Sequence, residues 1–402
     1  METAEIVVVG AGIIGLTLAR ELVARGARVL VLEKEGAPGR HASGRNSGVL
    51  HAGIYYAPGS ARARSCLAGN RLMRAYCRER GLPLEESGKV IVTKCHEELP
   101  RLHALFERAQ SAGASVSLVD ESELREIEPH ARTVGRAIHS PLTAVVDPKA
   151  VLAGLRDDLR QSRRAEIRFN VRVHGPSGPG SLDTSAGRLA YGAMANASGA
   201  HADRLAHAFG KGLRYMLVPF KGLYRKLRPQ AAHLVRGSVY PVPDPATPFL
   251  GVHFTRSVYG EVYLGPTAIP ALGRENYGLL KGLDAEAPSI LWRDAMLFAS
   301  SPVFRRVALS EPRKYLFKHF FADAARLVDA LDPADVLPSP KAGIRPQLVD
   351  VEQNAMVMDF VTETGPAELH VLNAISPAFT ASMAMAPGLA DSVLGLSGSA
   401  GA

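Results

Sequence analysis

The hydrophobic and polar positions of the first 33 residues follow a strand, a helix and a second strand in turn. A β-branched run at 6–9 is followed by apolar residues at helical spacing over 16–25. Gly26 ends the predicted helix, and residues 28–33 return to a strand pattern. The segment predicts a parallel βαβ unit with a right-handed crossover.

Glycines at positions 10, 12 and 15 join the first predicted strand to the helix. They let the backbone turn tightly and let a pyrophosphate approach the helix N-terminus, where unpaired amides and the helix dipole favour negative charge. Glu33 ends the next strand, 18 residues after Gly15. An acid at that place binds the ribose hydroxyls of an ADP group and disfavours the extra phosphate of NADP. The pattern predicts a dinucleotide site; the alternative is a tight turn that holds no ligand.

The rest of the chain mixes both periodicities. The expected elements are strands at 88–93, 167–173, 192–199, 217–227, 249–255 and 261–265, and helices at 97–112 and 201–209. A hairpin turn is predicted at 258–260. Residues 274–331 read as mostly helical, and a final helix begins near Ser376, with Pro387 producing a kink or a helix end. The order predicts a nucleotide-binding sheet and a second, β-rich portion.

The composition excludes several classes of protein. The 402 residues are 47% hydrophobic and 21% charged, which is typical of a globular chain with two compact units. No stretch approaches the roughly 18 uncharged apolar residues of a membrane-spanning helix. Glu2 and Glu5 stand where a signal peptide is basic. We therefore expect a cytoplasmic protein, with at most peripheral contact with the inner face of the membrane.

Cysteines and charge narrow the partners further. Cys66, Cys77 and Cys95 have no C-x-x-C spacing, so we expect neither disulfides nor a metal site. The net charge of +8 suits nucleic acid, an anionic membrane or an acidic substrate. Basic residues cluster at 71–80 and 160–168 without forming a long run. We interpret these clusters as solvated helix faces and expect no nucleic-acid partner.

A long loop rich in glycine and polar residues, at 39–56, follows the βαβ unit. With that unit, it resembles the L-2-hydroxyglutarate oxidase/dehydrogenase family of the D-amino-acid-oxidase-like flavoproteins. The other matching strings are 43–60, 219–224, 240–245 with 251–253, and 342–347. The resemblance runs in order from about residue 5 to 390. Its most specific part is the string N-x-G-x-x-H-A-G-x-Y-Y at 46–56.

The resemblance implies an α/β fold with a Rossmann-like FAD-binding domain and a second α+β substrate domain built on an antiparallel sheet. The expected FAD-binding domain is discontinuous and comprises 1–85, 147–212 and 340–395. The expected substrate-binding domain comprises 86–146 and 213–339, and a disordered tail is expected at 396–402.

The resemblance also implies which residues bind FAD. Gly10, Gly12 and Gly15 face the pyrophosphate, Glu33 binds the adenosine ribose, and Val173 contacts adenine through its backbone. The remaining expected contacts are Ser43, Arg45, Asn46 and Ser47, beside the pyrophosphate and isoalloxazine, and Gly199, which closes the nucleotide site.

The implied reaction is oxidation of a 2-hydroxy acid, foremost L-2-hydroxyglutarate to 2-oxoglutarate, by hydride transfer to flavin. His51 is the expected general base, because histidine is poised near neutral pH. Arg345 is expected to hold the α-carboxylate through two parallel hydrogen bonds. Lys221, with Tyr224 and His253, is expected to engage the distal carboxylate. Several family members have arginine in place of this lysine, which lacks the bidentate fork.

Two other functions compete with this one. An FAD-dependent amine oxidase of the glycine or sarcosine oxidase type shares Arg345 but needs no second cationic anchor; the string at 51–56 favours the hydroxy acid. A flavin-containing nucleic-acid-binding protein is supported only by the net charge. The expected partners are a small dicarboxylate or hydroxy-acid substrate and an electron acceptor, which is oxygen, a quinone or an electron-transfer protein.

Overall fold

The computed structural model describes residues 2–244 and 249–399, which fall into two compact units. Unit 1 comprises the chain up to Asn46, Pro148–Val218, and the chain from Arg345 onward. Unit 2 comprises Ser47–Asp147 and Pro219–Ile344. Residues 47–85, which we expected in the nucleotide-binding domain, therefore belong to unit 2.

The eight-stranded sheet of unit 1 has the order β10-β11-β12-β1-β2-β9, with β21 also beside β12 and β20 beside β21. Its parallel strands are β1 (Glu2–Val9), β2 (Val29–Leu32), β9 (Ala165–Arg168), β12 (Gly187–Asn196) and β21 (Glu368–Asn373). Its antiparallel strands are β10 (Val173–Gly178), β11 (Ser181–Thr184) and β20 (Val361–Thr364). Because β1 and β2 are parallel neighbours joined by a helix, the predicted βαβ unit is confirmed.

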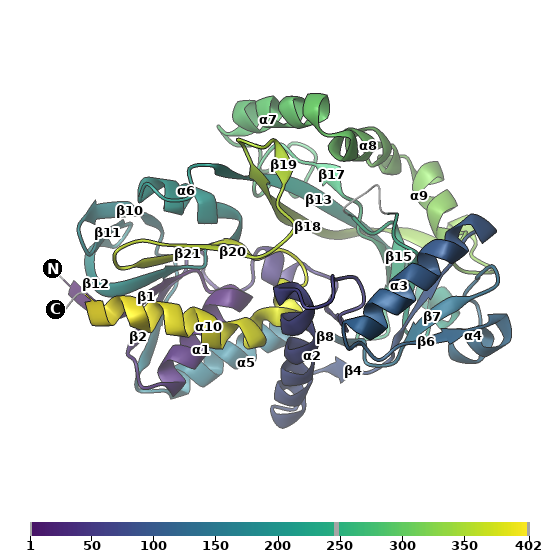
Figure 1. The fold of residues 1–402 in the computed structure, drawn as a ribbon, viewed down its shortest axis with the longest axis horizontal. Helices are drawn as coiled ribbons and strands as arrows, with labels where there is room; N and C mark the ends of the chain where they lie inside the picture. Colours follow the sequence, from purple (N-terminus) through teal and green to yellow (C-terminus); the bar gives the residue numbers. More distant parts are fainter. Residues whose placement is uncertain (1, 245–248, 400–402) are drawn as a thin grey trace. The chain divides into compact units, whose positions relative to one another are not determined.

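Three helices of unit 1 pack together. The first helix, α1 (Ile13–Ala24), contacts both α5 (Pro148–Gln161) and α10 (Ala378–Ser399), and Figure 1 shows α10 lying along α1. Residues 13–19 and Leu22 are buried, so the first two turns of α1 are buried on all sides. The short helices of unit 1 are η1 (Ala42–Gly44), η3 (Gly199–His201) and α6 (Ala202–Ala208).

A ten-stranded sheet, most of which belongs to unit 2, has the order β19-β18-β13-β16-β15-β14-β5-β7-β6, and β17 pairs with β13. By the bounds of the units, β19, the start of β13 and the end of β18 belong to unit 1. The strands are β5 (Lys89–Val92), β6 (Ser117–Val119), β7 (Ala137–Ser140), β13 (Tyr215–Leu227), β14 (Ser238–Pro241), β15 (His253–Arg256), β16 (Val262–Gly265), β17 (Ile269–Pro270), β18 (Val336–Asp350) and β19 (Ala355–Met356). Strands β15 and β16 form the predicted hairpin. Although most pairs are antiparallel, β14 and β5 are parallel.

Unit 2 also contains a smaller sheet and several helices. A three-stranded sheet consists of β3 (Val49–Leu50), β8 (Ala144–Val146) and β4 (Leu84–Glu85). The helices are α2 (Ala61–Glu79), η2 (His96–Glu98), α3 (Leu99–Ser111), α4 (Glu121–Ile127), η4 (Pro229–Leu234), α7 (Ala287–Ser300), α8 (Pro302–Ser310), η5 (Pro312–Tyr315), α9 (Phe317–Ala324) and η6 (Pro333–Asp335). Among the helices of the described residues, none combines the length and apolarity that crossing a bilayer requires.

The two faces of the ten-stranded sheet differ in chemistry. Val90, Val239, Phe254 and Leu264 are paired across neighbouring strands and belong to one buried apolar cluster. Side chains alternate along a strand, so the residues that flank them point to the other face. That face carries the polar and aromatic side chains Lys89, Ser238, Tyr240, His253, Thr255 and Tyr263, and also Ile91, which belongs with Tyr240 to a second buried apolar cluster. The side chains of unit 2 that can donate or accept hydrogen bonds to a ligand are therefore found on this second face, which we call the polar face.

Two local predictions were wrong. The single strand expected at 167–173 is divided between β9 and β10, because Asn170 has a φ of +59° in the left-handed region, which interrupts a strand. Residues 396–399 of the expected disordered tail are the last turn of α10, while 400–402 lie outside the described residues. Pro387 lies inside α10, so the helix does not end there.

Candidate functional site

The glycine turn after β1 is packed so closely that it excludes side chains. Gly10 has a φ of +106°, and a Cβ there would lie 2.6 Å from the carbonyl oxygen of Ala197. A Cβ on Gly15 would lie 1.9 Å from the carbonyl oxygen of Gly10. The backbone can therefore run close to a ligand at the start of α1, as a pyrophosphate site requires.

Glu33 lies at the end of β2, and its buried carboxylate is fixed from two sides. Oε2 accepts a hydrogen bond from the backbone N–H of Ala11 at 2.7 Å, and Oε1 accepts one from Glu35 at 2.9 Å. The backbone of Glu33 also accepts from Val171, two residues before Val173. The predicted ribose and adenine residues thus lie on adjoining segments of unit 1.

The loop around η1 contacts the start of α1. The hydroxyl of Ser43 accepts a 3.0 Å hydrogen bond from the N–H of Ile13 and caps the helix, whose N-cap residue is Gly12. Asn46 donates to the carbonyl of Ser43 at 2.8 Å, and Arg45 donates to Arg40 at 2.7 Å. These bonds hold the loop beside the glycine turn.

This part of unit 1 fits the ADP portion of FAD. It offers a turn without room for side chains at Gly10 and Gly15, an adjacent helix N-terminus, and a buried carboxylate on the next strand. Gly199, with a φ of +59°, begins η3 next to the Ala197–Ser198 backbone that contacts Gly10. Of the expected cofactor residues, Ser47 alone belongs to unit 2.

His51 follows β3 in unit 2, and its backbone is anchored by α2. The side-chain amide of Asn70 donates to the carbonyls of Leu50, His51 and Leu142 at 3.1–3.2 Å. The thiol of Cys66 also donates to the carbonyl of His51, at 3.3 Å. Asn70 is only 2% exposed, so this anchor is buried. All three cysteines are free thiols, as expected.

Sequence reasoning missed Asn70, although the sequence carries a signal for it. The buried positions of α2 are Ala63, Cys66, Gly69, Asn70, Met73, Tyr76 and Cys77, at helical spacing. A polar amide within that stripe needs hydrogen-bond partners when it is buried. The partners themselves lie in other elements and are not apparent from the stripe.

Lys221 lies on β13, and its ammonium is hydrogen-bonded to other groups of the protein. Its ammonium donates to Asn276 Oδ1 at 2.9 Å and to the carbonyl of Gly278 at 2.5 Å, and the side chain is 3% exposed. Burial lowers its pKa. Tyr224 is three residues along the strand, and its ring faces Tyr263 and the ammonium of Lys341, 5.1 Å away. Lys341 received no role from the sequence.

His253 lies on β15 and stacks on Tyr240, with ring centroids 3.8 Å apart. Its Nδ1 lies 2.7 Å from the carbonyl of Gly251, so that nitrogen carries the proton. Burial lowers the pKa of His253 to about 4. The imidazole is therefore neutral at pH 7, and its one N–H is already donated.

Arg345 lies half-buried on β18, within the stretch where this strand passes from unit 2 to unit 1. Its neighbours Ile344 and Gln347 are buried, which fixes the strand. The predicted carboxylate residue thus stands on regular secondary structure.

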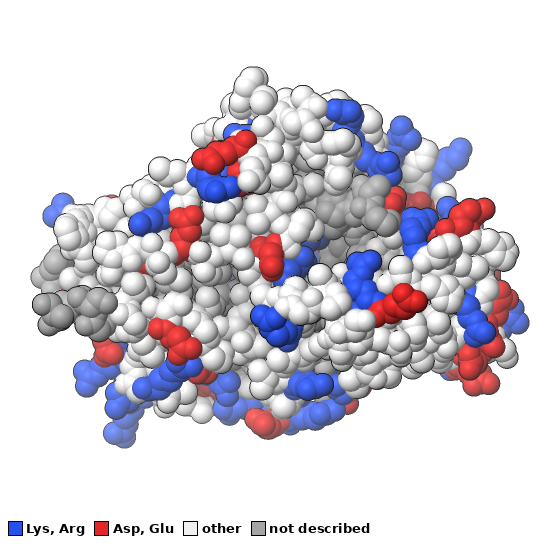
Figure 2. Space-filling model, viewed as in Figure 1, with Lys and Arg blue, Asp and Glu red and all other residues white. Residues whose placement is uncertain are grey.

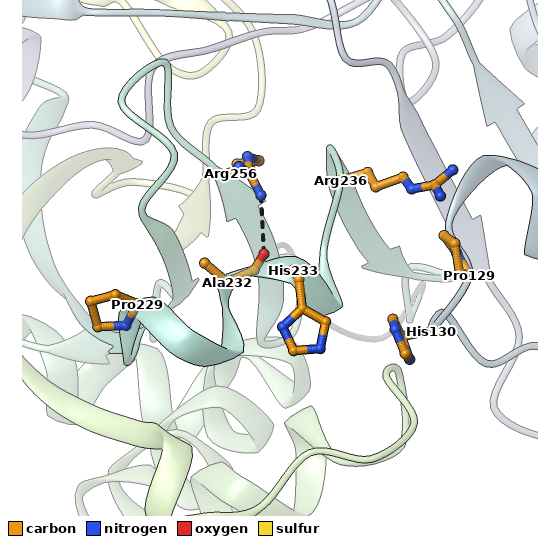
Figure 3. Close-up of a pocket in the computed structure, with 7 residues that line it drawn as sticks. All are labelled: Pro129, His130, Pro229, Ala232, His233, Arg236 and Arg256. Atoms are coloured by element: carbon orange, nitrogen blue, oxygen red, sulfur yellow. Dashed lines mark hydrogen bonds between the residues drawn. The ribbon is translucent and has the colours of Figure 1, made fainter.

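A surface pocket in unit 2 is distinct from these residues. It is lined by Pro129, His130, Pro229, Ala232, His233, Arg236 and Arg256 (Figure 3). Arg256 donates to the carbonyl of Ala232 at 3.0 Å, and Arg236 donates to that of Glu126 at 3.0 Å. None of the site residues predicted from the sequence lines this pocket.

The basic clusters seen in the sequence are accompanied by acidic residues. Arg74 and Arg78 both pair with Glu86, and Arg168 pairs with Glu2 and Glu166. On the face drawn in Figure 2, Lys and Arg side chains lie among Asp and Glu. Both clusters therefore contain ion-paired surface residues. Arg74 and Arg78 lie on a helix, α2, as we interpreted, whereas Arg168 lies on strand β9.

Comparison with known proteins identifies close relatives. The L-2-hydroxyglutarate dehydrogenase of Escherichia coli (strain K12) is 36% identical over 396 residues, which are 94% of this chain and 90% of that protein. The mitochondrial L-2-hydroxyglutarate dehydrogenase of Caenorhabditis elegans is 36% identical, covering 95% and 91%. The human mitochondrial protein of that name is 33% identical, covering 97% and 88%.

Solved structures share the fold. An L-alpha-glycerophosphate oxidase from Mycoplasma pneumoniae with FAD bound superposes with a TM-score of 0.75 at 22% identity, covering 99% of this chain and 95% of that one. A glycine oxidase from Geobacillus kaustophilus gives a TM-score of 0.72 at 21% identity, covering 98% and 95%. The predicted fold class is confirmed.

A family model described as FAD dependent oxidoreductase (DAO) matches residues 5–392. The match covers nearly the whole chain, as do the sequence relatives, and it includes the glycine turn and Glu33. The chain belongs to the DAO family of FAD-dependent oxidoreductases.

Proposed function

We propose that this enzyme oxidises L-2-hydroxyglutarate to 2-oxoglutarate. The observation that carries the proposal is the similarity to L-2-hydroxyglutarate dehydrogenases at 33–36% identity over about 95% of the chain. The string from His51 to Tyr56 supports a hydroxy acid rather than an amine as substrate.

Oxidation of the alcohol removes a hydride from the α-carbon and a proton from the hydroxyl group. Bound FAD supplies the hydride acceptor. His51 takes the hydroxyl proton on its imidazole, because histidine is the residue type whose unperturbed pKa lies closest to neutral pH. Asn70 supports this role by donating a hydrogen bond to the carbonyl of His51 from a buried side chain.

Arg345 binds the α-carboxylate in this proposal. A guanidinium offers two parallel N–H groups to a carboxylate and so fixes both the position and the orientation of the α-carbon. Because Arg345 stands on β18, its position is set by a strand rather than by a loop.

The cofactor contacts proposed for unit 1 are the glycine turn, Glu33, the backbone of Val173 and Gly199. The loop residues Ser43, Arg45, Asn46 and Ser47 complete them on the pyrophosphate and isoalloxazine side. Turnover also requires a second substrate that accepts two electrons, which is oxygen, a quinone or an electron-transfer protein.

The test is anaerobic reduction of the purified yellow protein. L-2-hydroxyglutarate, its D-enantiomer, L-lactate, glycine and sarcosine are added separately while the flavin absorbance is recorded. Bleaching by the L-diacid alone is the expected result. Bleaching by glycine or sarcosine instead would assign the chain to the amine oxidases, and no bleaching by any of the five would refute the proposed substrate.

A further inference from the structure

Lys89 is a buried cation that unit 2 leaves without a hydrogen-bond partner. It begins β5, its side chain is 2% exposed, and its Nζ has no partner among the described residues. Its ammonium lies 4.6 Å from the ring centroid of Tyr55 and 4.9 Å from that of Tyr240. Aromatic faces compensate a cation in part, but they leave its three N–H donors unused. A buried charge without an acceptor is costly, so this arrangement calls for a functional reason.

Two more unused polar groups lie around Lys89. The hydroxyls of Tyr55 and Ser238 are buried and have no partner within the described chain. Ser238 and Lys89 directly precede the paired residues Val239 and Val90, so their side chains are neighbours on the polar face of the sheet. Several unsatisfied donors in one place are expected where a ligand brings the acceptors.

Two of the other groups considered for a second carboxylate, Lys221 and His253, already bind acceptors within the protein. Lys221 donates to Asn276 and Gly278, which ties β13 to the segment after β17. His253 is neutral at pH 7 and donates its N–H to Gly251. Lys89 alone among these three residues retains all its donors.

We infer that Lys89 and Tyr55 form the subsite for the distal carboxylate of a dicarboxylate substrate. This inference rests on the proposed function and deepens it, since the sequence assigned the role to Lys221. The Lys89 ammonium and the Tyr55 hydroxyl donate to the two carboxylate oxygens, while the rings of Tyr55 and Tyr240 keep water away and strengthen the ion pair. A monocarboxylate of equal length leaves the ammonium unpaired and is disfavoured.

The subsite also gives the H-A-G-x-Y-Y string a physical meaning. Tyr55 follows the proposed base His51 by four residues, so one short segment carries both the proton acceptor and a donor for the second carboxylate. An oxidase for a substrate with a single carboxylate has no use for this second donor.

The test uses glutarate and valerate, which have the same chain length and differ by one carboxylate. Their dissociation constants are measured with the oxidised, FAD-loaded protein by perturbation of the flavin spectrum. The unmodified protein is expected to prefer glutarate, and Lys89→Met is expected to weaken glutarate binding by about 10- to 100-fold with valerate unchanged. Tyr55→Phe is expected to weaken glutarate binding by a smaller factor.

Two further lysine variants make the result specific. Lys318→Met removes an exposed lysine of α9 and is the control for loss of one positive charge. Lys221→Met tests the competing anchor: loss of the glutarate preference in this variant and not in Lys89→Met would overturn the inference. An unmodified protein that binds glutarate and valerate alike would overturn it as well. Lys89→Met removes a buried charge that has no hydrogen-bond acceptor, so its melting temperature is expected to stay level or rise, which checks folding.

Failure of the two proposals is distinguishable. If L-2-hydroxyglutarate does not bleach the flavin but Lys89→Met still abolishes the preference for glutarate, the subsite stands and the proposed reaction is refuted. If the L-diacid bleaches the flavin and Lys89→Met keeps the preference, the reaction stands and the subsite is refuted.

Discussion

The N–H of Ala11 donates a 2.7 Å hydrogen bond to Glu33 Oε2, which joins the glycine turn after β1 to the end of β2. The same carboxylate accepts from the N–H of Glu35 at 2.9 Å. One buried side chain thus holds two backbone segments of the nucleotide site in place.

Glu33→Ala is expected to weaken both the fold and FAD binding. Loss of two charge-assisted hydrogen bonds leaves buried amides without an acceptor, which costs about 1–3 kcal/mol of unfolding free energy. FAD affinity is expected to fall by about 10- to 100-fold, because the ribose contact is lost and the turn is released. Urea unfolding and titration of the apoprotein with FAD measure the two effects. Glu5→Gln, an exposed change in β1, is the control, and unchanged FAD affinity in Glu33→Ala would contradict the assigned role.

Asn70→Ala is expected to disturb His51 from a distance. Three backbone carbonyls lose their buried donor, which lowers the free energy of unfolding by about 1–3 kcal/mol. Because the carbonyl of His51 is then released, flavin reduction by substrate is expected to slow by more than substrate binding weakens. The exposed variant Arg71→Ala on the same helix is the control. A variant that is less stable yet reduces its flavin at the parental rate and with the parental pH profile would confine Asn70 to a structural role.

The features that the sequence predicted are those that depend on neighbouring residues. The glycines at 10, 12 and 15 and the acid at 33 are fixed by one βαβ unit, whose geometry follows from local patterns. The hairpin at 258–260 is likewise a local turn between two strands that pair directly.

The features that escaped prediction depend on contacts between distant segments. In the sequence, Lys89 is only the first residue of a β-branched strand. Its burial without a hydrogen-bond acceptor arises when Tyr55 and Tyr240, from two other segments, cover its ammonium. Lys221 and His253 looked available because their partners, Asn276 with Gly278 and the carbonyl of Gly251, follow from tertiary structure. Asn170 broke a predicted strand through a backbone conformation that hydrophobic periodicity does not encode.

Arg345→Ala is expected to raise KM for the hydroxy acid by about 10- to 150-fold, since a charge-assisted carboxylate contact contributes about 1.5–3 kcal/mol. The flavin content is expected to stay unchanged. Arg345→Lys keeps the charge without the two parallel donors, so its KM is expected to lie between that of the unmodified protein and that of Arg345→Ala. Steady-state kinetics with an artificial electron acceptor gives these values. Loss of FAD with no change in KM would assign Arg345 to the cofactor instead.

His51→Ala is expected to slow flavin reduction by about 10²- to 10⁴-fold, the usual contribution of a general base. The dissociation constant for substrate is expected to change little, because the carboxylate contacts remain. Anaerobic stopped-flow mixing separates the two quantities. Reduction of His51→Ala at the parental rate would exclude this residue as the base.

The charge of Lys89 makes diacid binding depend on pH. Burial lowers the pKa of Lys89 to about 7. Of the groups that face it, burial raises the pKa of Cys66 and of Tyr240 to about 12 and that of Tyr55 well above 10, and it lowers that of His253 to about 4. Between pH 6 and 9 Lys89 is therefore the group of this set that changes charge.

A carboxylate binds the ammonium form, which is lost as the pH rises through about 7. The dissociation constant for glutarate is expected to rise about tenfold for each pH unit above this value, while that for valerate stays level. The stability of the fold changes with pH in the opposite sense. Between about pH 7 and the ordinary lysine pKa of 10.5, Lys89 is protonated in the unfolded chain and neutral in the folded one. The free energy of unfolding therefore rises with pH over that window. In Lys89→Met, both the glutarate dissociation constant and the free energy of unfolding are expected to lose this dependence on pH. A glutarate affinity that stays constant from pH 6 to 9 in the unmodified protein would show that the buried ammonium does not hold the second carboxylate.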